Sequence, residues 1–198
     1  MDFAKEINGF TLEYFDDIHV YLVDGVIVQS ITQILKHKFG KKYDVIDKST
    51  LRRASEAGTA VHEAIENYCK TGEVRDLKEL KNFMFLQKQY GFEVIENEVP
   101  VILFQDGKPI SAGRLDMVIK MNGKLGGADI KRTSALDKDY LAYQLNLYRI
   151  AYKQSYGEDW EFLKGIHLRD DVRKFVNIPI NEKLAWDLIE EWRKNEQR

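Results

Sequence analysis

Two aspartates and a lysine lie on two consecutive segments that have the composition of β-strands. Asp116 is in ISAGRLDMVIKM, and Asp129 and Lys131 are in KLGGADIKRT, the next segment along the chain. The Asn122-Gly123 pair between them is typical of a hairpin turn. If the hairpin brings these side chains together, the two carboxylates repel each other and need a cation. Carboxylate oxygens are ligands that Mg²⁺ and Mn²⁺ prefer, so the pattern predicts a metal site at one end of a sheet.

Successive side chains of a strand point to opposite sides, which predicts the residues that share a face of this hairpin. The two sets are Arg114, Asp116 and Val118 on the first strand, and Gly127, Asp129 and Lys131 on the second. Lys131 could then hold or activate an attacking water, or neutralise charge on a phosphoryl transition state. The alternative is that these charged side chains face solvent. Acidic residues are disfavoured within strands, which favours the functional interpretation, although Asp-x-Lys is a short pattern.

Two predicted helices carry further polar residues at helical spacing. His62 and Glu66 are four residues apart in GTAVHEAIENY and therefore share a helix face. Gly58 lies one turn earlier, where it would permit close approach of another element. Gln144 and Tyr148 have the same spacing in YQLNLYR. By themselves, such a histidine and such a pair are more often structural than functional.

The order of the predicted elements indicates an α/β fold with a mixed sheet. The expected strands are residues 11–15, 19–23, 26–30, 92–104, 110–121, 124–133, 160–168 and 172–178. The expected helices run from Ser30 or Thr32 through Leu35, from Ser49 or Thr50 to Gly72, from Leu77 to Tyr90, from about Leu136 to Ser155, and from Asn181 through Ile189. We expect a single domain over residues 1–198, with an N-terminal β-hairpin and basic helical extension in 1–48 and the core in 49–198.

The segment from Lys36 to Arg53 is basic, with seven positive charges against two negative ones, a net charge of +5. Its charged residues are Lys36, Lys38, Lys41, Lys42, Lys48, Arg52 and Arg53, against Asp44 and Asp47. Such a run is either a solvated face or a surface that contacts phosphates, and the sequence alone does not separate the two.

Length and composition exclude several classes of protein. The chain has 198 residues, of which 44% are hydrophobic and 31% charged, as in an ordinary globular domain. No apolar stretch is long enough to span a membrane, so no membrane partner is expected. A single cysteine, Cys69, excludes a disulfide framework and a four-cysteine cluster, and the expected location is the reducing cytoplasm. With a net charge of −2, nucleic-acid binding would need a local basic surface.

The order of the polar motifs resembles the RecB-type branch of the PD-(D/E)XK nuclease superfamily. The motifs are Gly58-x-x-x-His62, Gly113-Arg114-x-Asp116, Asp129-x-Lys131 and Gln144-x-x-x-Tyr148. Glu98 lies where such nucleases carry an acidic residue on the preceding strand. The segment HVYLVDGVIVQSITQIL is similar to the start of compact phage-encoded members, so the resemblance covers almost the whole chain. The cysteine quartet of relatives with an iron–sulfur cluster is absent.

The resemblance implies a restriction-endonuclease-like three-layer core, in which helices flank a mixed central sheet. It implies catalytic roles for Asp116, Asp129, Lys131 and Glu98. The implied ligands of Mg²⁺ or Mn²⁺ are His62, Asp116, Asp129 and Ile130, and Glu66 would orient the His62 ring through its second nitrogen. An imidazole ligand suits Mn²⁺ somewhat better than Mg²⁺. The residues expected to contact nucleic acid are Gln144, Tyr148, Arg114, Arg132, Arg52 and Arg53.

The expected function is a metal-dependent deoxyribonuclease that hydrolyses DNA phosphodiester bonds, as an exonuclease in recombination or repair, of either phage or host origin. One or two divalent ions can supply a water nucleophile, charge stabilisation and help for the leaving oxygen. The alternatives are a structure-specific or nicking endonuclease, a non-catalytic nucleic-acid-binding module and a metal-binding structural protein. The expected partners are the DNA substrate and a single-strand annealing or recombination protein. Polarity, strand preference, DNA versus RNA and oligomeric state stay open.

Overall fold

The computed structural model describes residues 3–40 and 47–196 of the chain. Its strands are β1 (Phe3–Ile7), β2 (Phe10–Phe15), β3 (Val20–Val23), β4 (Val26–Ser30), β5 (Glu93–Gln105), β6 (Lys108–Met121), β7 (Lys124–Lys131), β8 (Phe162–Leu168) and β9 (Arg173–Ile178). Its helices are α1 (Ile31–Phe39), α2 (Lys48–Thr71), α3 (Lys78–Tyr90), α4 (Lys138–Tyr156) and α5 (Glu182–Glu196), with a 3-10 turn at Asp16–Ile18.

The strands of the described residues form one mixed sheet in the order β1-β2-β3-β4-β6-β7-β8-β9, and β5 pairs with β6. The pairs β4–β6 and β7–β8 are parallel, whereas the other pairs are antiparallel. Parallel neighbours need crossover connections, and the segments that contain α4 and the α1–β5 stretch supply them. The chain is therefore an α/β protein with a mixed central sheet.

Strand β6 has two partners along the edge that faces away from β5. Its first half pairs with β4 at Ser111 and Ala112, and its second half pairs with β7 from Met117 to Met121. In the described pairing, residues 113–116 lie between these two ladders. The sheet thus opens at the point where Asp116 lies.

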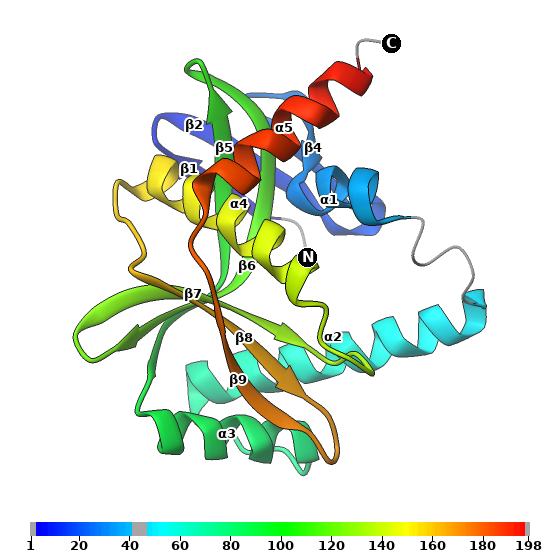
Figure 1. Ribbon diagram of the computed structural model, residues 1–198, viewed down its shortest axis with the longest axis vertical. Helices are drawn as coiled ribbons and strands as arrows, with labels where there is room; N and C mark the ends of the chain where they lie inside the picture. The colour runs from blue at the N-terminus through cyan, green and yellow to red at the C-terminus, as the bar shows by residue number, and fades with distance from the viewer. Residues whose placement is uncertain (1–2, 41–46, 197–198) are drawn as a thin grey trace.

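Helices cover both faces of the sheet (Figure 1). The α1, α4 and α5 helices share one core with the sheet, which includes Ile34, Leu145 and Leu188. The α2 and α3 helices lie on the opposite side and share a second core, which includes Ile65 and Phe83. A third cluster packs the N-terminal strands against Ile102 and Phe104 of β5 and Ala112 of β6. These cores bury the apolar faces that the sequence periodicity predicts.

The predicted elements agree with the structure to within a few residues at their ends. Gly72 and Gly91 end α2 and α3 in the left-handed conformation, with φ of 77° and 64°. Ser30 caps α1 in a capping box with Gln33. Strand β1 is not among the expected strands, although Asn8-Gly9 between β1 and β2 is a strong hairpin signal.

Two glycines of β7 allow aromatic rings to lie directly against this strand. A Cβ atom at Gly127 would lie 2.2 Å from Trp160 Cζ3, and one at Gly126 would lie 2.3 Å from Phe162 Cε2. The rings therefore pack where side chains would otherwise stand, and they fix the strand that carries Asp129 and Lys131.

None of the described helices combines the length and the apolar composition that crossing a membrane requires.

Candidate metal centre

Three side chains from three elements converge on one point. They are His62 of α2, Glu98 of β5 and Asp116 of β6, and one potential ligand atom from each lies within 4.8 Å of the others. The Nδ1 atom of His62 is 3.7 Å from Asp116 Oδ1 and 3.9 Å from Glu98 Oε1. The set offers one imidazole nitrogen and two carboxylates, which suits a small divalent cation such as Mn²⁺ or Mg²⁺.

Glu98 is held in an unusual backbone conformation. Its φ is 52°, although it lies within β5. The flanking pairs of the ladder are Asn97–Met117 and Val99–Leu115, so Glu98 stands opposite Asp116. Its Oε2 accepts an ion-pair contact of 2.6 Å from Arg114 Nε. The Glu98 backbone is therefore strained, and its side chain is held in place beside the Asp116 carboxylate and the His62 imidazole.

Asp116 also ties the two strands of the hairpin together where their ladder ends. The last pair of the β6–β7 ladder is Met117–Ala128, and beyond it the Ile130 N–H donates to Asp116 Oδ2 at 2.6 Å. The Ile130 side chain is buried in the core under α2 and α3, so only its main-chain carbonyl could serve as the expected metal ligand.

Asp129 and Lys131 form a pair next to this cluster. Lys131 Nζ is 2.5 Å from Asp129 Oδ2, and the Asp129 side chain is 3% exposed. Burial and then the charge of Asp116 raise the pKa of Asp129 to about 6, against the opposing effect of Lys131. Asp129 is outside the group of three that shares the 4.8 Å limit, whereas Glu98 is within it.

The charge balance around His62 favours a cation. Burial by itself would lower the pKa of His62, but the carboxylates of Asp116 and Glu98 outweigh it and raise this pKa to about 9. The negative charge of Asp116 and Glu98 that holds a proton on the His62 imidazole would also hold a metal ion in place of that proton, because either positive charge neutralises the carboxylates.

Side-chain alternation in β6 fails close to Asp116. Leu115 and Val118 both pack in the core under α4, although strict alternation would place them on opposite faces. The common face expected for Arg114, Asp116 and Val118 therefore does not hold for Val118. The irregularity lies opposite Glu98, whose positive φ changes the course of the partner strand.

Gln144 and Tyr148 of α4 support the site from inside the protein. Both side chains are buried, and Tyr148 Oη donates to the carbonyl oxygen of Arg114 at 3.1 Å, in the opening of the sheet between β4 and β7. Gln144 Oε1 has no hydrogen-bond partner among the described residues. This burial leaves neither side chain the surface for the expected contact with a nucleic-acid backbone. Their contacts instead support a role in shaping the site.

Several charged residues expected at the site have other partners. Glu66 bonds to Lys70, one turn further along α2, rather than to His62. Arg132 Nε is 2.6 Å from Glu79 Oε1, and Arg132 Nη2 is 3.8 Å from Asp170 Oδ1. Arg132 therefore serves as a bridge between β7, α3 and the β8–β9 turn. The expected roles of Glu66 in orienting His62 and of Arg132 in binding phosphate do not match these contacts.

The basic segment is only partly described. Arg52 and Arg53 are exposed on α2, and Arg52 pairs with Glu56 at 2.8 Å. Lys38 pairs with Glu191, and Asp47 caps α2. Lys41, Lys42 and Asp44 lie outside the described residues.

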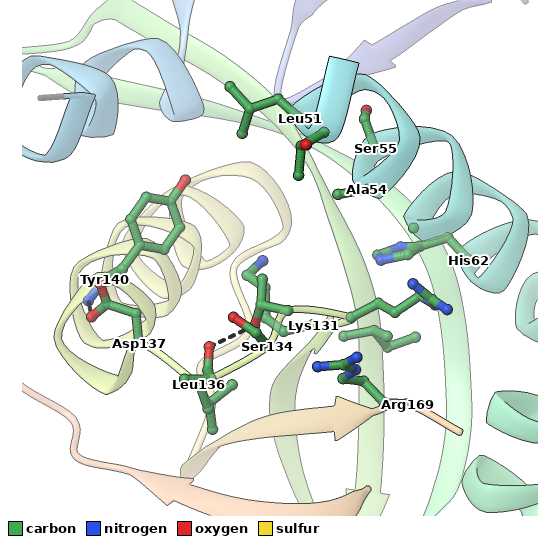
Figure 2. A pocket seen from close by; sticks show the side chains of 16 residues that line it. Leu51, Ala54, Ser55, His62, Lys131, Ser134, Leu136, Asp137, Tyr140 and Arg169 are labelled. Carbon is green, nitrogen blue, oxygen red and sulfur yellow. Dashed lines mark hydrogen bonds between the residues drawn. The ribbon is translucent and has the colours of Figure 1, made fainter. Parts of the chain in front are cut away.

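A cleft of about 860 Å³ leads to the cluster from the side of α2. One wall is the first half of α2, and the other is the 132–137 loop and the start of α4 (Figure 2). We call this space the α2–α4 cleft; it is lined by residues 50, 51, 54, 55, 58, 62, 130–137, 140 and 169. His62 and Lys131 lie at its inner end. The sequence analysis missed Arg169, which lines the cleft, because no local motif marks it.

Gly58 has a different role from the one expected. A Cβ atom added at this position meets no atom within 4 Å. No element of the described part of the chain therefore packs against Gly58, which lines the cleft instead.

A second hollow of about 290 Å³ lies on the other side of the cluster and is lined in part by Glu98, Arg114, Glu66 and Lys5. The two hollows share no lining residue, and His62 of the first lies beside Glu98 of the second. The cluster is thus open on two sides.

Comparison with known proteins adds little to this geometry. No family model matches the chain, and no curated protein matches it. Among solved structures, one described as "Crystal structure of SSO0001" is 19% identical over 82% of this chain and 84% of that chain, with a TM-score of 0.40. A likeness of this strength carries no argument about fold family or activity.

Proposed function

We propose that this chain is a divalent-metal-dependent nuclease with the restriction-endonuclease-like fold of the PD-(D/E)XK superfamily. The observation that carries the proposal is the convergence of His62, Glu98 and Asp116 beside the Asp129–Lys131 pair. These residues come from separate elements, and the order of their motifs along the chain is the one that resembles RecB-type nucleases. A structural metal site would not need an adjacent lysine held by a buried aspartate.

In this proposal His62, Glu98 and Asp116 hold Mg²⁺ or Mn²⁺, with Asp129 and the Ile130 carbonyl close by. The bound ion supplies an acidified water and stabilises charge on the phosphoryl group. Lys131, which Asp129 holds in place, is available to orient that water or to stabilise the developing negative charge. Arg114 restrains Glu98, and Tyr148 restrains the Arg114 backbone, so the carboxylates keep their positions before substrate arrives.

We propose DNA as the substrate, with exonuclease action in recombination or repair in the cytoplasm, and a single-strand annealing or recombination protein as a partner. The alternative within the same chemistry is a structure-specific or nicking endonuclease. The two differ in their need for an end, so end-labelled linear duplex and closed circular DNA separate them. Degradation of the linear form with survival of the circle supports the exonuclease, and rapid nicking of the circle supports the alternative.

The central test is cleavage by Asp116→Asn, Glu98→Gln and Lys131→Ala with Mg²⁺, Mn²⁺ or excess chelator. We expect each variant to lose about 10²-fold or more in rate, because each removes a ligand or a charge-stabilising group. Glu66→Gln is the matched control, since Glu66 lies one turn from His62 but bonds to Lys70. Undiminished cleavage in chelator, or wild-type rates in Asp116→Asn and Lys131→Ala, would reject the proposal.

A further inference from the structure

The guanidinium group of Arg169 lines the α2–α4 cleft without a partner among the residues that the structure describes. Arg169 directly follows β8, and Figure 2 shows it on the side of the cleft away from Tyr140. Its side chain is half-buried and makes no ion pair or hydrogen bond with any residue that the structure describes. A half-buried cation without a counter-charge is costly, unless a ligand supplies the charge.

The other cations that line the cleft are already neutralised. Lys131 is paired with Asp129 at 2.5 Å, and Arg132 with Glu79 at 2.6 Å. His62 lies 3.7 Å from Asp116 and 3.9 Å from Glu98, so its charge is also balanced. Among the described residues that line the cleft, Arg169 is thus the cation left for an external anion. The carboxylate of Asp137, which also lines the cleft, is engaged as the N-cap of α4, where it accepts from the Tyr140 N–H.

The backbone of Arg169 is fixed from two directions. Its N–H donates to the Val172 carbonyl at 2.8 Å, and its own carbonyl accepts from Asn82 Nδ2 of α3 at 2.8 Å. The next residue, Asp170, lies 3.8 Å from Arg132. The turn is therefore held against α3 and β7, and a ligand would not have to order it on binding.

We propose that Arg169 binds a backbone phosphate of the nucleic acid, next to the phosphodiester that is hydrolysed. This inference rests on the proposed nuclease function. A guanidinium group matches the two free oxygens of a phosphodiester with parallel N–H donors. The apolar and hydroxyl groups along the same walls, such as Leu51, Ser55 and Leu136, leave room for the chain that carries this phosphate without opposing its charge. The strand therefore follows the α2–α4 cleft to the cluster.

The test compares Arg169→Gln and Arg169→Lys with Arg173→Gln. Arg173 is on the same hairpin, but its guanidinium stacks on Phe85, 3.7 Å from the ring centre, and it does not line the cleft. The probe is a fluorescein-labelled oligodeoxynucleotide, single-stranded and duplex, whose binding is measured by anisotropy with Ca²⁺ in place of Mg²⁺ over a series of salt concentrations. Mn²⁺ titration and thermal unfolding are measured for every variant.

We expect Arg169→Gln to weaken binding roughly tenfold and to lower the salt dependence by about one ion, because one phosphate contact is lost. Arg169→Lys should restore the salt dependence but not the full affinity, since lysine keeps the charge and loses the paired donors. Arg173→Gln should bind like the wild type, and none of the variants should change Mn²⁺ binding.

Three outcomes overturn the inference, and they can be told apart. If the wild type binds or cleaves DNA and Arg169→Gln matches Arg173→Gln in affinity and salt dependence, the role of Arg169 is wrong while the nuclease proposal stands. If the wild type neither binds nor cleaves any of the probes, the nuclease proposal itself fails, and this inference fails with it. A loss of affinity that follows a loss of thermal stability, and that lysine does not repair, also rejects a phosphate contact.

Discussion

Glu98 adopts an unfavourable backbone conformation that places its carboxylate beside His62. A non-glycine residue with positive φ costs on the order of 1 kcal/mol or more, and here it interrupts a long strand. Its carboxylate gains the Arg114 ion pair and the position beside His62. A glycine would adopt this φ without strain but would lose both contacts. The contacts of the Glu98 carboxylate at the site, rather than the packing of the sheet, therefore account for this backbone conformation.

At Gly58, a single substitution should increase the stability of the fold and at the same time weaken the binding of nucleic acid. Because an added Cβ meets nothing within 4 Å, Gly58→Ala should raise the free energy of unfolding in urea by about 1 kcal/mol, the usual gain of alanine over glycine within a helix. The same methyl group enters the α2–α4 cleft, so affinity for the oligodeoxynucleotide should fall.

Thr59→Ala is the control for Gly58→Ala, because Thr59 is exposed on the same helix and does not line the cleft. It should change neither affinity nor cleavage. A destabilised Gly58→Ala would instead mean that another element needs the close approach that the glycine allows.

At the scale of elements, the Glu79–Arg132–Asp170 chain joins α3, the end of β7 and the β8–β9 turn. The Glu79 side chain is 3% exposed, whereas that of Arg132 is 27% exposed. Arg132 directly follows Lys131, so the position of Lys131 depends on this bridge. Although the sequence places Arg132 beside an Asp-x-Lys motif, its contacts join the strand to the helix.

We predict that Arg132→Ala lowers the free energy of unfolding by about 3 kcal/mol, because it leaves the buried Glu79 carboxylate without its partner. Urea denaturation measures this change. Arg52→Ala is the control: its side chain is 82% exposed and its pair with Glu56 lies on the surface, so the loss should stay below about 0.5 kcal/mol. Equal effects of the two substitutions would contradict the structural role of Arg132.

The sequence was sufficient to predict every described helix and every strand except β1, but not the contacts between residues far apart in the chain. Asp106-Gly107 and Asn122-Gly123 mark the turns of the β5–β6–β7 hairpins because such pairs tolerate positive φ at both positions. Asp116, Asp129 and Lys131 could be singled out because charged residues are unusual inside strands. The partner of Arg132 could not, because Glu79 lies 53 residues away. The positive φ of Glu98 also arises only from tertiary packing, as does the lack of a partner for the Arg169 guanidinium among the described residues.

At the scale of the whole molecule, the centre lies where the sheet opens between β4 and β7 on one edge of β6. Two carboxylates from neighbouring strands meet in this opening, and a histidine from the helix layer above completes the group. The protein has a net charge of −2. The carboxylates of Asp116, Glu98 and Asp129 are balanced here by His62, Arg114 and Lys131. Under the proposed function, a bound cation would add the positive charge that favours a phosphate backbone.

The last prediction tests the metal centre without any measurement of activity. Mn²⁺ that binds the folded chain stabilises it by mass action, by about 2.7 kcal/mol at a hundredfold excess over its dissociation constant. For a chain of this size such a gain corresponds to a rise of roughly 5–10 °C in the unfolding temperature, measured by calorimetry. Asp116→Asn and His62→Ala should lose most of the shift, whereas Glu66→Gln should keep it. In chelator the wild type should remain folded, because the cores under α4 and under α2 and α3 consist of apolar side chains. An unfolding temperature that Mn²⁺ does not move, or an equal shift in Asp116→Asn, would show that these residues do not form the metal site.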